Sequence, residues 1–393
     1  MVSDINVTET IEDKKSWFNI KRFKIGGNNF QKPEKSMDVK NLNKDTYSTL
    51  KEAFKFYEAT KVIKKYDNLM KLYDEDDSQK INQFFYKRDW LSGVPNVVNF
   101  TFEFNPFNYV NNIDHLSWFF DQYYPYSKLI LTVPNIKLKK TFDNKTQDII
   151  NLDSYLRFVD SVFEILNNKN CKPIFVPISM RMGIRKLNEL MQHYLKKEYY
   201  YYWFDFESQP INETSLGRLR HIFNIIKKDE TFDKVISYFT NIRREKLSNS
   251  HDDTSIASDA LSAIAGANLI GVNREPQRYF IPKSSSGSRA EEISIRKSTD
   301  VDPSHKARIF DRETYYYVKT TDSALFPKNR YVPINAAKLN AEFSAQTEYF
   351  LQNHDVETLL NQKSMFKDEN AGNMLKELTS RSVDLNHTIS DFW

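Results

Sequence analysis

The middle of this chain alternates strand-like and helix-like segments, and this alternation limits the possible folds more than any other feature. Segments rich in β-branched and aromatic residues predict strands over 97–104, 128–133, 172–178, 199–206, 234–241 and 268–272. Apolar residues at helical spacing predict helices between them, over 114–123, 153–167, 184–197, 213–228 and 255–265. Strands and helices that alternate with short connections predict a parallel sheet covered by helices.

Such a series forms either an open doubly wound sheet or a (β/α)8 barrel. Two upstream strand candidates, Asn19–Ile25 and Met37–Val39, bring the number of strands to eight, so we predict an α/β fold of the TIM-like (β/α)8 barrel type. The barrel would span 19–320 after an N-terminal tail over 1–18. It would carry a helical insertion over about 46–90, whose helix over 46–73 buries Phe54, Tyr57, Val62 and Leu69. A polar loop over 284–304 is predicted to be mobile, a strand pair over 305–319 follows it, and a helical extension over 321–393 ends the chain.

Composition removes several classes of protein. Cys171 is the one cysteine, so the chain has no internal disulfide and no multi-cysteine metal site, and the 7 histidines show no metal-binding spacing. The 9 glycines form no phosphate-binding loop. Residues 1–15 are polar, and no apolar segment is long enough to span a membrane. We therefore expect a cytoplasmic protein without cofactor or metal, and its net charge of +4 permits a nucleic-acid partner.

The chemistry of a (β/α)8 barrel lies at the carboxyl ends of its strands. The polar residues at these ends are Glu103, Asn105, Asn135, Ser179, Arg181, Asp205, Glu207, Asn241, Arg243, Asn273 and Arg274. This mixture of carboxylates, amides and guanidiniums suits a polar heterocycle or a phosphate. Asp205 and Glu207 flank Phe206 and so point to the same side, where they either perform acid–base catalysis or neutralise a neighbouring arginine. Glu103 faces either solvent or the barrel interior.

The order of elements resembles the tRNA-guanine transglycosylase family, whose members exchange a guanine encoded in tRNA for a 7-deazaguanine base. The stretches that carry the resemblance are Ile25–Val39, Lys172–Leu190, Ser258–Arg278 and Lys306–Tyr317. The resemblance implies a barrel that binds nucleic acid, either tRNA or DNA, and a guanine-type base. It also implies a homodimer or a catalytic partner subunit.

Several positions depart from the family pattern. Alignment without gaps places Gly271 where the family has its nucleophilic aspartate and Asn268 where it has an earlier aspartate. Glu103 or Asn105 falls near the family's other important aspartate, Asn135 near the base-reading aspartate and Ser179 near a glutamine. Glycine cannot attack a ribose carbon, so base exchange requires a carboxylate from elsewhere in the chain, within reach of Gly271.

Three hypotheses follow from these residues. In the first, the chain is a base-exchanging glycosyltransferase in which Glu103 and Asp205 are catalytic. Asn105, Asn135, Ser179, Glu207 and Asn241 would then bind the base, and Arg181, Arg243, Arg274 and Arg278 would bind the nucleic-acid backbone. In the second, the same barrel is a catalytically inactive nucleic-acid-binding or partner subunit. In the third, the chain is an unrelated barrel hydrolase whose carboxylates are Asp205 and Glu207.

Overall fold

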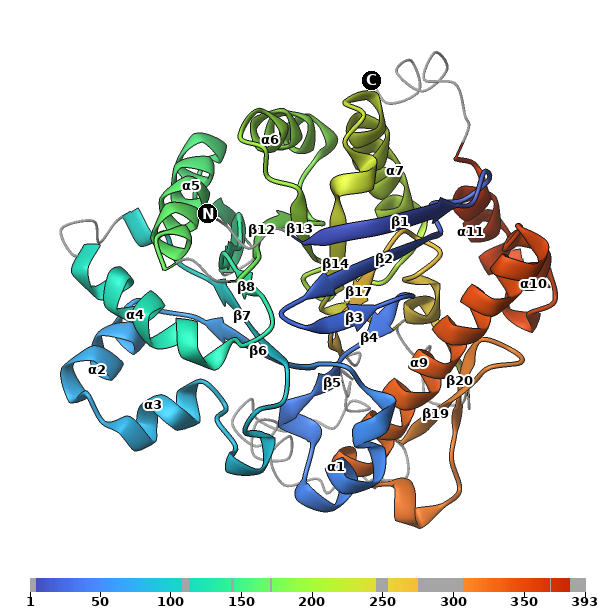
Figure 1. Ribbon diagram of the computed structural model, residues 1–393, viewed down its shortest axis with the longest axis horizontal. Helices are drawn as coiled ribbons and strands as arrows, with labels where there is room; N and C mark the ends of the chain where they lie inside the picture. The colour runs from blue at the N-terminus through green and yellow to red at the C-terminus, as the bar shows by residue number, and fades with distance from the viewer. Residues whose placement is uncertain are drawn as a thin grey trace, which may run out of the picture.

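The computed structural model describes residues 5–107, 113–142, 145–169, 172–244, 254–274, 307–367 and 369–381. The predicted loop over 284–304 lies outside the described residues, and so do Cys171 and Arg278. A ring of strands fills the centre of the molecule and helices surround it (Figure 1).

The strands form a closed parallel barrel of eight strand positions, which confirms the predicted fold class. One sheet has the order β5-β6-β7-β9 and the other the order β4-β17-β14-β13-β12-β8. β4 and β5 are two parts of the first barrel strand, and β8 and β9 are two parts of the fourth, so the chain itself joins the two sheets into a ring. The bounds are β4 (Glu34–Lys35), β5 (Met37–Asp38), β6 (Tyr57–Ile63), β7 (Asn96–Phe102), β8 (Leu131–Thr132), β9 (Asn135–Ile136), β12 (Ile174–Ser179), β13 (Tyr201–Asp205), β14 (Ile236–Thr240) and β17 (Leu269–Ile270). A short parallel pair, β15 (Ile242–Arg243) and β18 (Asn273–Arg274), continues the seventh and eighth strands.

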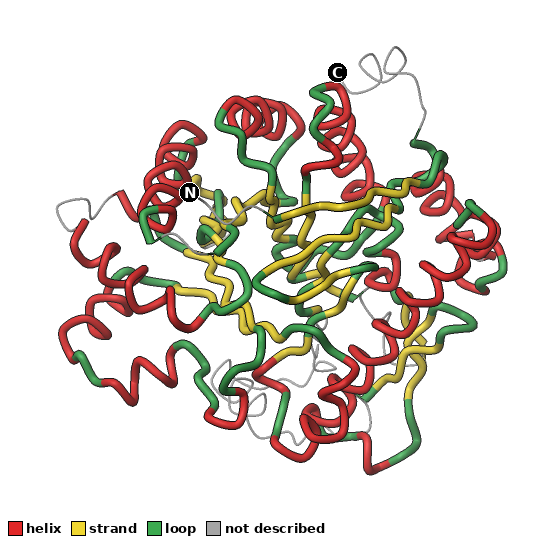
Figure 2. Tube along the Cα trace, viewed as in Figure 1, coloured by secondary structure: helices red, strands yellow, loops and turns green. Residues whose placement is uncertain are grey.

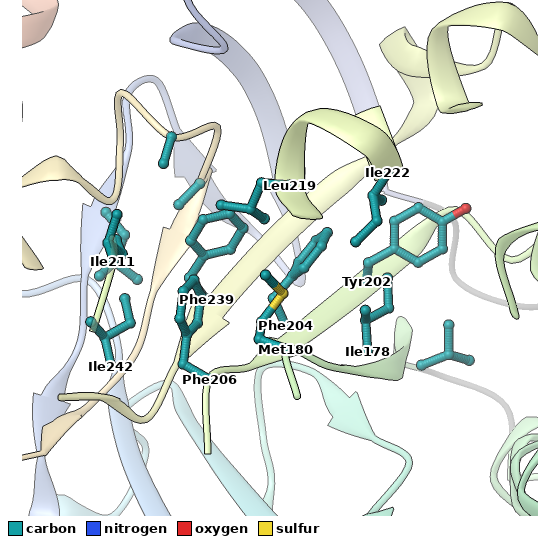
Figure 3. Close-up of a cluster of buried hydrophobic side chains, with 14 of the residues drawn as sticks. Ile178, Met180, Tyr202, Phe204, Phe206, Ile211, Leu219, Ile222, Phe239 and Ile242 are labelled. Atoms are coloured by element: carbon teal, nitrogen blue, oxygen red, sulfur yellow. The ribbon is translucent and has the colours of Figure 1, made fainter. Parts of the chain in front are cut away.

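Helices cover the outside of this ring (Figure 2). They are α1 (Lys44–Leu50), α2 (Asp67–Glu75), α3 (Ser78–Phe84), α4 (Ile113–Tyr126), α5 (Leu152–Asn167), α6 (Ile184–Lys196) and α7 (Glu213–Lys228). α7 begins with a capping box, in which the side chain of Asn212 accepts a hydrogen bond from the Ser215 N–H and the Ser215 hydroxyl accepts one from the Asn212 N–H. Its apolar face, with Leu219 and Ile222, packs on outward-facing side chains of β13 and β14 such as Phe204 (Figure 3).

The first strand candidate was assigned wrongly, because 19–25 does not belong to the barrel. These residues form β2 (Asn19–Ile25), which pairs antiparallel with β1 (Asn6–Glu12) and with β3 (Asn28–Phe30). The predicted N-terminal tail therefore contains a strand. Phe23 and Phe30 of this small sheet pack in one cluster with Val97 and Ile236, which lie near the amino ends of their barrel strands. The small sheet thus closes the amino end of the barrel.

The second barrel strand was also missed, because β6 lies where the sequence predicts a helix over 46–73. Tyr57 is buried as expected, but Val62 is 36% exposed, since strand alternation replaces helical spacing. The helix predicted over 255–265 is instead β16 (Thr254–Ile256) and a 3-10 helix, η6 (Ser258–Leu261). A hairpin of β10 (Lys139–Phe142) and β11 (Lys145–Asp148) was not predicted. The other 3-10 helices are η1 (Val39–Asn41), η2 (Lys51–Ala53), η3 (Asp89–Leu91), η5 (Phe232–Lys234), η8 (Ser323–Leu325) and η9 (Ser364–Lys367).

The C-terminal region is helical, as predicted, and it packs against the barrel. The predicted strand pair is present as β19 (Arg308–Asp311) and β20 (Tyr316–Lys319), and α9 (Lys328–Asn353), α10 (Glu357–Asn361) and α11 (Glu369–Thr379) follow. α9 packs against the first barrel strand, where Asn340 Oδ1 accepts a hydrogen bond of 2.9 Å from the N–H of Lys35. No helix in the described part of the chain is both long and apolar enough to span a membrane.

The small N-terminal sheet should contribute strongly to stability. Phe30 is 1% exposed and its ring stacks on Phe23 at 5.0 Å, so Phe30→Ala removes a large buried side chain and leaves a cavity. We expect the free energy of unfolding to fall by about 3–5 kcal/mol. Val62→Ala is the control and should cost less than about 1 kcal/mol, because Val62 lies at a partly exposed position. Urea unfolding followed by circular dichroism measures both variants, and equal losses would contradict this assignment of the sheet.

Candidate active site

The interior of the barrel becomes polar above its amino end. Alternate side chains of a barrel strand point inward, so residues two apart along a strand share the interior. On β6 this pair is Glu58 and Thr60, and on β7 it is Asn99 and Thr101. All four are at most 2% exposed. Buried polar groups of this kind require hydrogen-bond partners, and two carboxylate-centred networks supply them.

The first network surrounds Glu58, whose side chain crosses the barrel interior. Its Oε1 accepts hydrogen bonds from the Thr60 hydroxyl at 2.7 Å, the Asn99 amide at 2.9 Å and the Thr240 hydroxyl at 2.7 Å. Its Oε2 accepts from the Ser36 hydroxyl at 3.1 Å and from the N–H of Val272 at 2.7 Å. Glu58 therefore joins the first, second, third, seventh and eighth strand positions of the ring.

Gly271 faces this carboxylate and leaves the space that Glu58 occupies. A Cβ atom at position 271 would lie 2.5 Å from Thr240 Oγ1 and closer still to Glu58 Oε2. The resemblance aligned Gly271 with the family's nucleophilic aspartate, so base exchange would require another carboxylate within reach of Gly271. Glu58 is that carboxylate, but it is fully buried and holds five donors, so it has no free face for a substrate.

Lys35 supplies a positive charge beside the Glu58 network. It is buried, and its ammonium group donates to the carbonyl oxygen of Gly271. Burial lowers the pKa of Lys35 to about 8, although the negative charge of Glu58 acts in the opposite direction. Lys35 and Glu58 thus place opposite charges on the same side of the barrel.

The second network surrounds Asp205, at the carboxyl end of β13. Oδ2 of Asp205 accepts hydrogen bonds from the Thr101 hydroxyl at 3.1 Å and from the Asn135 amide at 2.9 Å. Oδ1 accepts from the Asn241 amide at 2.8 Å and from the N–H of Glu207 at 3.0 Å. Tyr155 donates to Asn135 Oδ1 at 3.1 Å, which directs the amide group of Asn135 toward the carboxylates. Asp205 is 0% exposed, so its carboxylate has no surface that a substrate could contact.

Glu207 is the other carboxyl group of this network, and its side chain is 5% exposed whereas Asp205 is fully buried. Its Oε1 accepts from the Ser179 hydroxyl and, at 3.4 Å, from the same Asn135 amide that binds Asp205. Arg181 lies 3.7 Å from its Oε2. Burial, and then the negative charge of Asp205, raise the pKa of Glu207 to about 7, while Ser179, Arg181 and Lys137 act in the opposite direction.

The backbone at these strand ends is held in the left-handed region. Glu207 has φ 48°, Ser208 has φ 62° and Asn241 has φ 57°. Side chains other than glycine adopt this conformation at a cost of about 1–3 kcal/mol, and such residues cluster at functional sites. Together with the raised pKa of Glu207, this strain indicates that the Asp205–Glu207 network is the candidate active site.

The structure brings together five of the residues that were predicted for the site, namely Asn135, Ser179, Asp205, Glu207 and Asn241. Arg181 contacts Glu207, and Arg274 Nε donates to Asn241 Oδ1 at 2.9 Å.

Three other predicted residues have different contacts. Glu103 forms an ion pair with Lys137. Asn105 accepts a hydrogen bond from the N–H of Phe107 at 3.0 Å, which stabilises a local turn. Arg243 lies on β15, and its Nε atom is buried without a hydrogen-bond partner in the described part of the chain.

Sequence reasoning missed Glu58, Thr101 and Tyr155. Glu58 and Thr101 lie inside their strands, whereas the predicted site residues were those at strand ends. Tyr155 reaches the site from α5. If 57–63 had been predicted as a strand, the two-residue spacing of Glu58 and Thr60 would have indicated that both side chains point into the barrel. Among the described residues there is no group of three or more His, Cys, Asp and Glu side chains that could hold a metal ion.

Solved structures with a similar arrangement include two barrel enzymes. The tryptophan synthase alpha-subunit of Pyrococcus furiosus is 11% identical, with a TM-score of 0.35, and the match covers 62% of this chain and 88% of that chain. A modular endo-beta-1,4-mannanase of Cellulomonas fimi, from glycoside hydrolase family 26, is 10% identical, with a TM-score of 0.37 over 66% of each chain. No protein-family model matches the sequence, and neither does any curated protein.

The contact between Gly271 and Glu58 can be tested with a double-mutant cycle. Gly271→Ala places a methyl group against Glu58 and Thr240, so we expect it to lower the free energy of unfolding by about 3 kcal/mol or more. Glu58→Ala is also destabilising, since it removes the acceptor of five hydrogen bonds. The double variant should lose less than the sum of the two, by about 1–3 kcal/mol, because the shortened side chain at position 58 makes room for the methyl group.

Gly217→Ala is the matched control for this cycle, because a Cβ atom at position 217 on α7 meets nothing within 4 Å. We expect it to stabilise the protein by about 0.5–1 kcal/mol. Urea unfolding measures the free energy of unfolding of the unmodified protein, the two single variants, the double variant and the control. Strict additivity of Gly271→Ala and Glu58→Ala would refute the contact.

Proposed function

We propose that this protein is a barrel enzyme that hydrolyses a glycosidic bond, with Glu207 as its general acid–base group. One observation carries the proposal: two neighbouring carboxyl groups at the mouth of the barrel have different environments. Asp205 is fully buried and accepts four hydrogen bonds, whereas Glu207 has a pKa near 7 and a side chain that is 5% exposed. Carboxyl pairs whose environments separate their protonation states are typical of acid–base catalysis.

A pKa near 7 suits Glu207 for this role, because both its protonated and ionised forms are populated at neutral pH. The protonated carboxyl group would donate its proton to the leaving oxygen or nitrogen as the glycosidic bond breaks. The resulting carboxylate could then accept a proton. Asp205 is a positioning residue in this mechanism, since its negative charge keeps the proton on Glu207.

Water is the attacking group that this arrangement favours. Covalent base exchange needs a carboxylate with a free lone pair at the sugar carbon. Glu58 and Asp205 are buried and accept five and four hydrogen bonds, and Glu103 is paired with Lys137. In the hydrolysis we propose, Glu207 would protonate the leaving group, and its carboxylate would then take a proton from the water molecule that attacks the sugar carbon.

The substrate we propose is a nucleoside-like molecule with a guanine-type base. Asn135, Asn241 and Ser179 are residue types that bind a purine edge, and to do so they would exchange the hydrogen bonds that they now make to Asp205 and Glu207. The resemblance to base-exchanging transglycosylases supports the same class of substrate. In the base-exchange alternative, Glu103 would have to leave Lys137 and act as the nucleophile. Nucleic acid as partner, and a cytoplasmic location, remain predictions from the sequence.

The first test of this function is Glu207→Gln, which keeps the shape of the side chain and removes its proton transfer. We expect kcat to fall by about 10²–10⁴-fold. Release of free base from guanosine, 7-deazaguanosine and total tRNA can be followed by chromatography. Glu213→Gln on the surface of α7 is the control and should keep full activity. Unchanged turnover in Glu207→Gln, or no base release by the unmodified protein, would reject the proposal.

A pH profile tests the role of Asp205. Its negative charge raises the pKa of Glu207, so Asp205→Asn should lower that pKa. Because the proposed acid is active when protonated, the fall of kcat/KM at high pH should move to lower pH, by roughly one pH unit. Lys137→Gln is the matched variant of opposite sign, since Lys137 lowers the pKa of Glu207 and its loss should move the same limb upward. Shifts in the same direction for both variants would contradict this assignment.

A further inference from the structure

A basic pocket lies beside the candidate active site, at the carboxyl ends of the first and eighth strands. It has a volume of about 170 Å³ and is bordered on one side by α9. Its lining includes the cations Lys35, Lys40, Arg244, Arg274 and Lys328, with Asp38 as the one carboxylate. The pocket is therefore strongly positive.

Carboxylates among the described residues offset part of this charge at Lys35, Lys40 and Arg244. Lys35 is close enough to Glu58 for the charge of that residue to act on its pKa, and Arg244 lies 3.7 Å from Asp259. For Lys40, Arg274 and Lys328, the described residues place no carboxylate oxygen within 4 Å of the charged nitrogen atoms. Within that part of the chain, Lys40, Arg274 and Lys328 thus form no ion pair, although the charges of Asp38 and Glu58 act on Lys40.

The electrostatic cost of this arrangement is visible at Lys40. Burial lowers its pKa, and the positive charge of Arg274 lowers it further, as does that of Lys328, while Asp38 and Glu58 act in the opposite direction. Cations that repel each other across a pocket attract an anion, since a bound anion removes the repulsion.

The size and the apolar side of the pocket limit the anion. Val332, Ala336 and Leu339 of α9 line the pocket together with the cations, so one wall can contact carbon atoms. Drug-sized ligands occupy sites of about 300–1,000 Å³, and this pocket is smaller. A phosphate group attached to a small organic group fits both its charge and its mixed lining.

We propose that this pocket binds the phosphate of a small phosphate monoester, with Lys40, Arg274 and Lys328 as its cationic ligands. The site goes beyond the proposed glycosidic-bond chemistry, but it adjoins that chemistry. Arg274 donates to Asn241, and Asn241 donates to Asp205, so one hydrogen-bond chain joins the pocket to the acid–base pair. A phosphorylated sugar bound here would place its sugar toward Glu207.

Isothermal titration calorimetry with ribose 5-phosphate and with ribose tests this site. We expect ribose 5-phosphate to bind and ribose not to bind, with inorganic phosphate competing. Lys40→Gln combined with Lys328→Gln should weaken binding of ribose 5-phosphate by about tenfold or more, because charge-assisted contacts to phosphate are lost. Neither residue belongs to the buried core, so the variant should fold. Lys338→Gln, at an exposed position of the same helix, is the matched control and should leave binding unchanged.

The remaining outcomes separate this proposal from its alternatives. Failure of ribose 5-phosphate to bind at low-millimolar concentration, or equal binding by the double variant, would overturn it. A single-stranded DNA oligonucleotide tests the other source of phosphate, and tight binding of DNA without binding of the monoester would assign the pocket to a nucleic-acid backbone and also overturn the proposal. Glu207→Gln should still bind ribose 5-phosphate, so loss of turnover and loss of phosphate binding are distinguishable.

Discussion

The buried carboxylate of Glu58 is the constraint on which the rest of the barrel depends. A carboxylate without partners is strongly unfavourable in a protein interior, so the strands around it must place donors at fixed positions. The donors come from side chains of Ser36, Thr60, Asn99 and Thr240 and from the backbone of Val272. Since a shift of one residue in any strand would turn its inward side chain outward, the network specifies the register of much of the ring.

Glu58 and Asp205 are both buried carboxylates that need hydrogen-bond donors, but the charges near them differ. Lys35 places a positive charge beside Glu58. The atoms that donate to Asp205 are a hydroxyl, two amides and one backbone N–H, all of which are neutral. The negative charge of Asp205 acts on the next ionisable group along the chain, Glu207, whose pKa it raises together with burial. The first network joins five strand positions of the barrel, whereas the second raises the pKa of Glu207.

The sequence predicted correctly the barrel strands that are apolar on both of their faces. Strands such as β12 and β13 are apolar on both faces, and short helices with one apolar stripe separate them, so their periodicity is easy to recognise. β6 was missed because its inward residues are the polar Glu58 and Thr60, which break the pattern of a buried strand. β2 was assigned to the barrel because a half-buried antiparallel strand shows the same alternation as a short barrel strand.

The candidate site could be predicted wherever its residues follow strands, because the carboxyl ends of parallel strands meet at one edge. This rule brought Asn135, Ser179, Asp205, Glu207 and Asn241 together in advance. It could not show that the pKa of Glu207 would be raised, since this depends on burial of the side chain and on the charge of Asp205 beside it. Local patterns locate the mouth of a barrel, but the protonation state of a group there is set by side chains that reach it from distant parts of the chain. Glu207 and Asp205 are only two residues apart, yet their surroundings differ: Asp205 accepts four hydrogen bonds, whereas burial and the charge of Asp205 raise the pKa of Glu207.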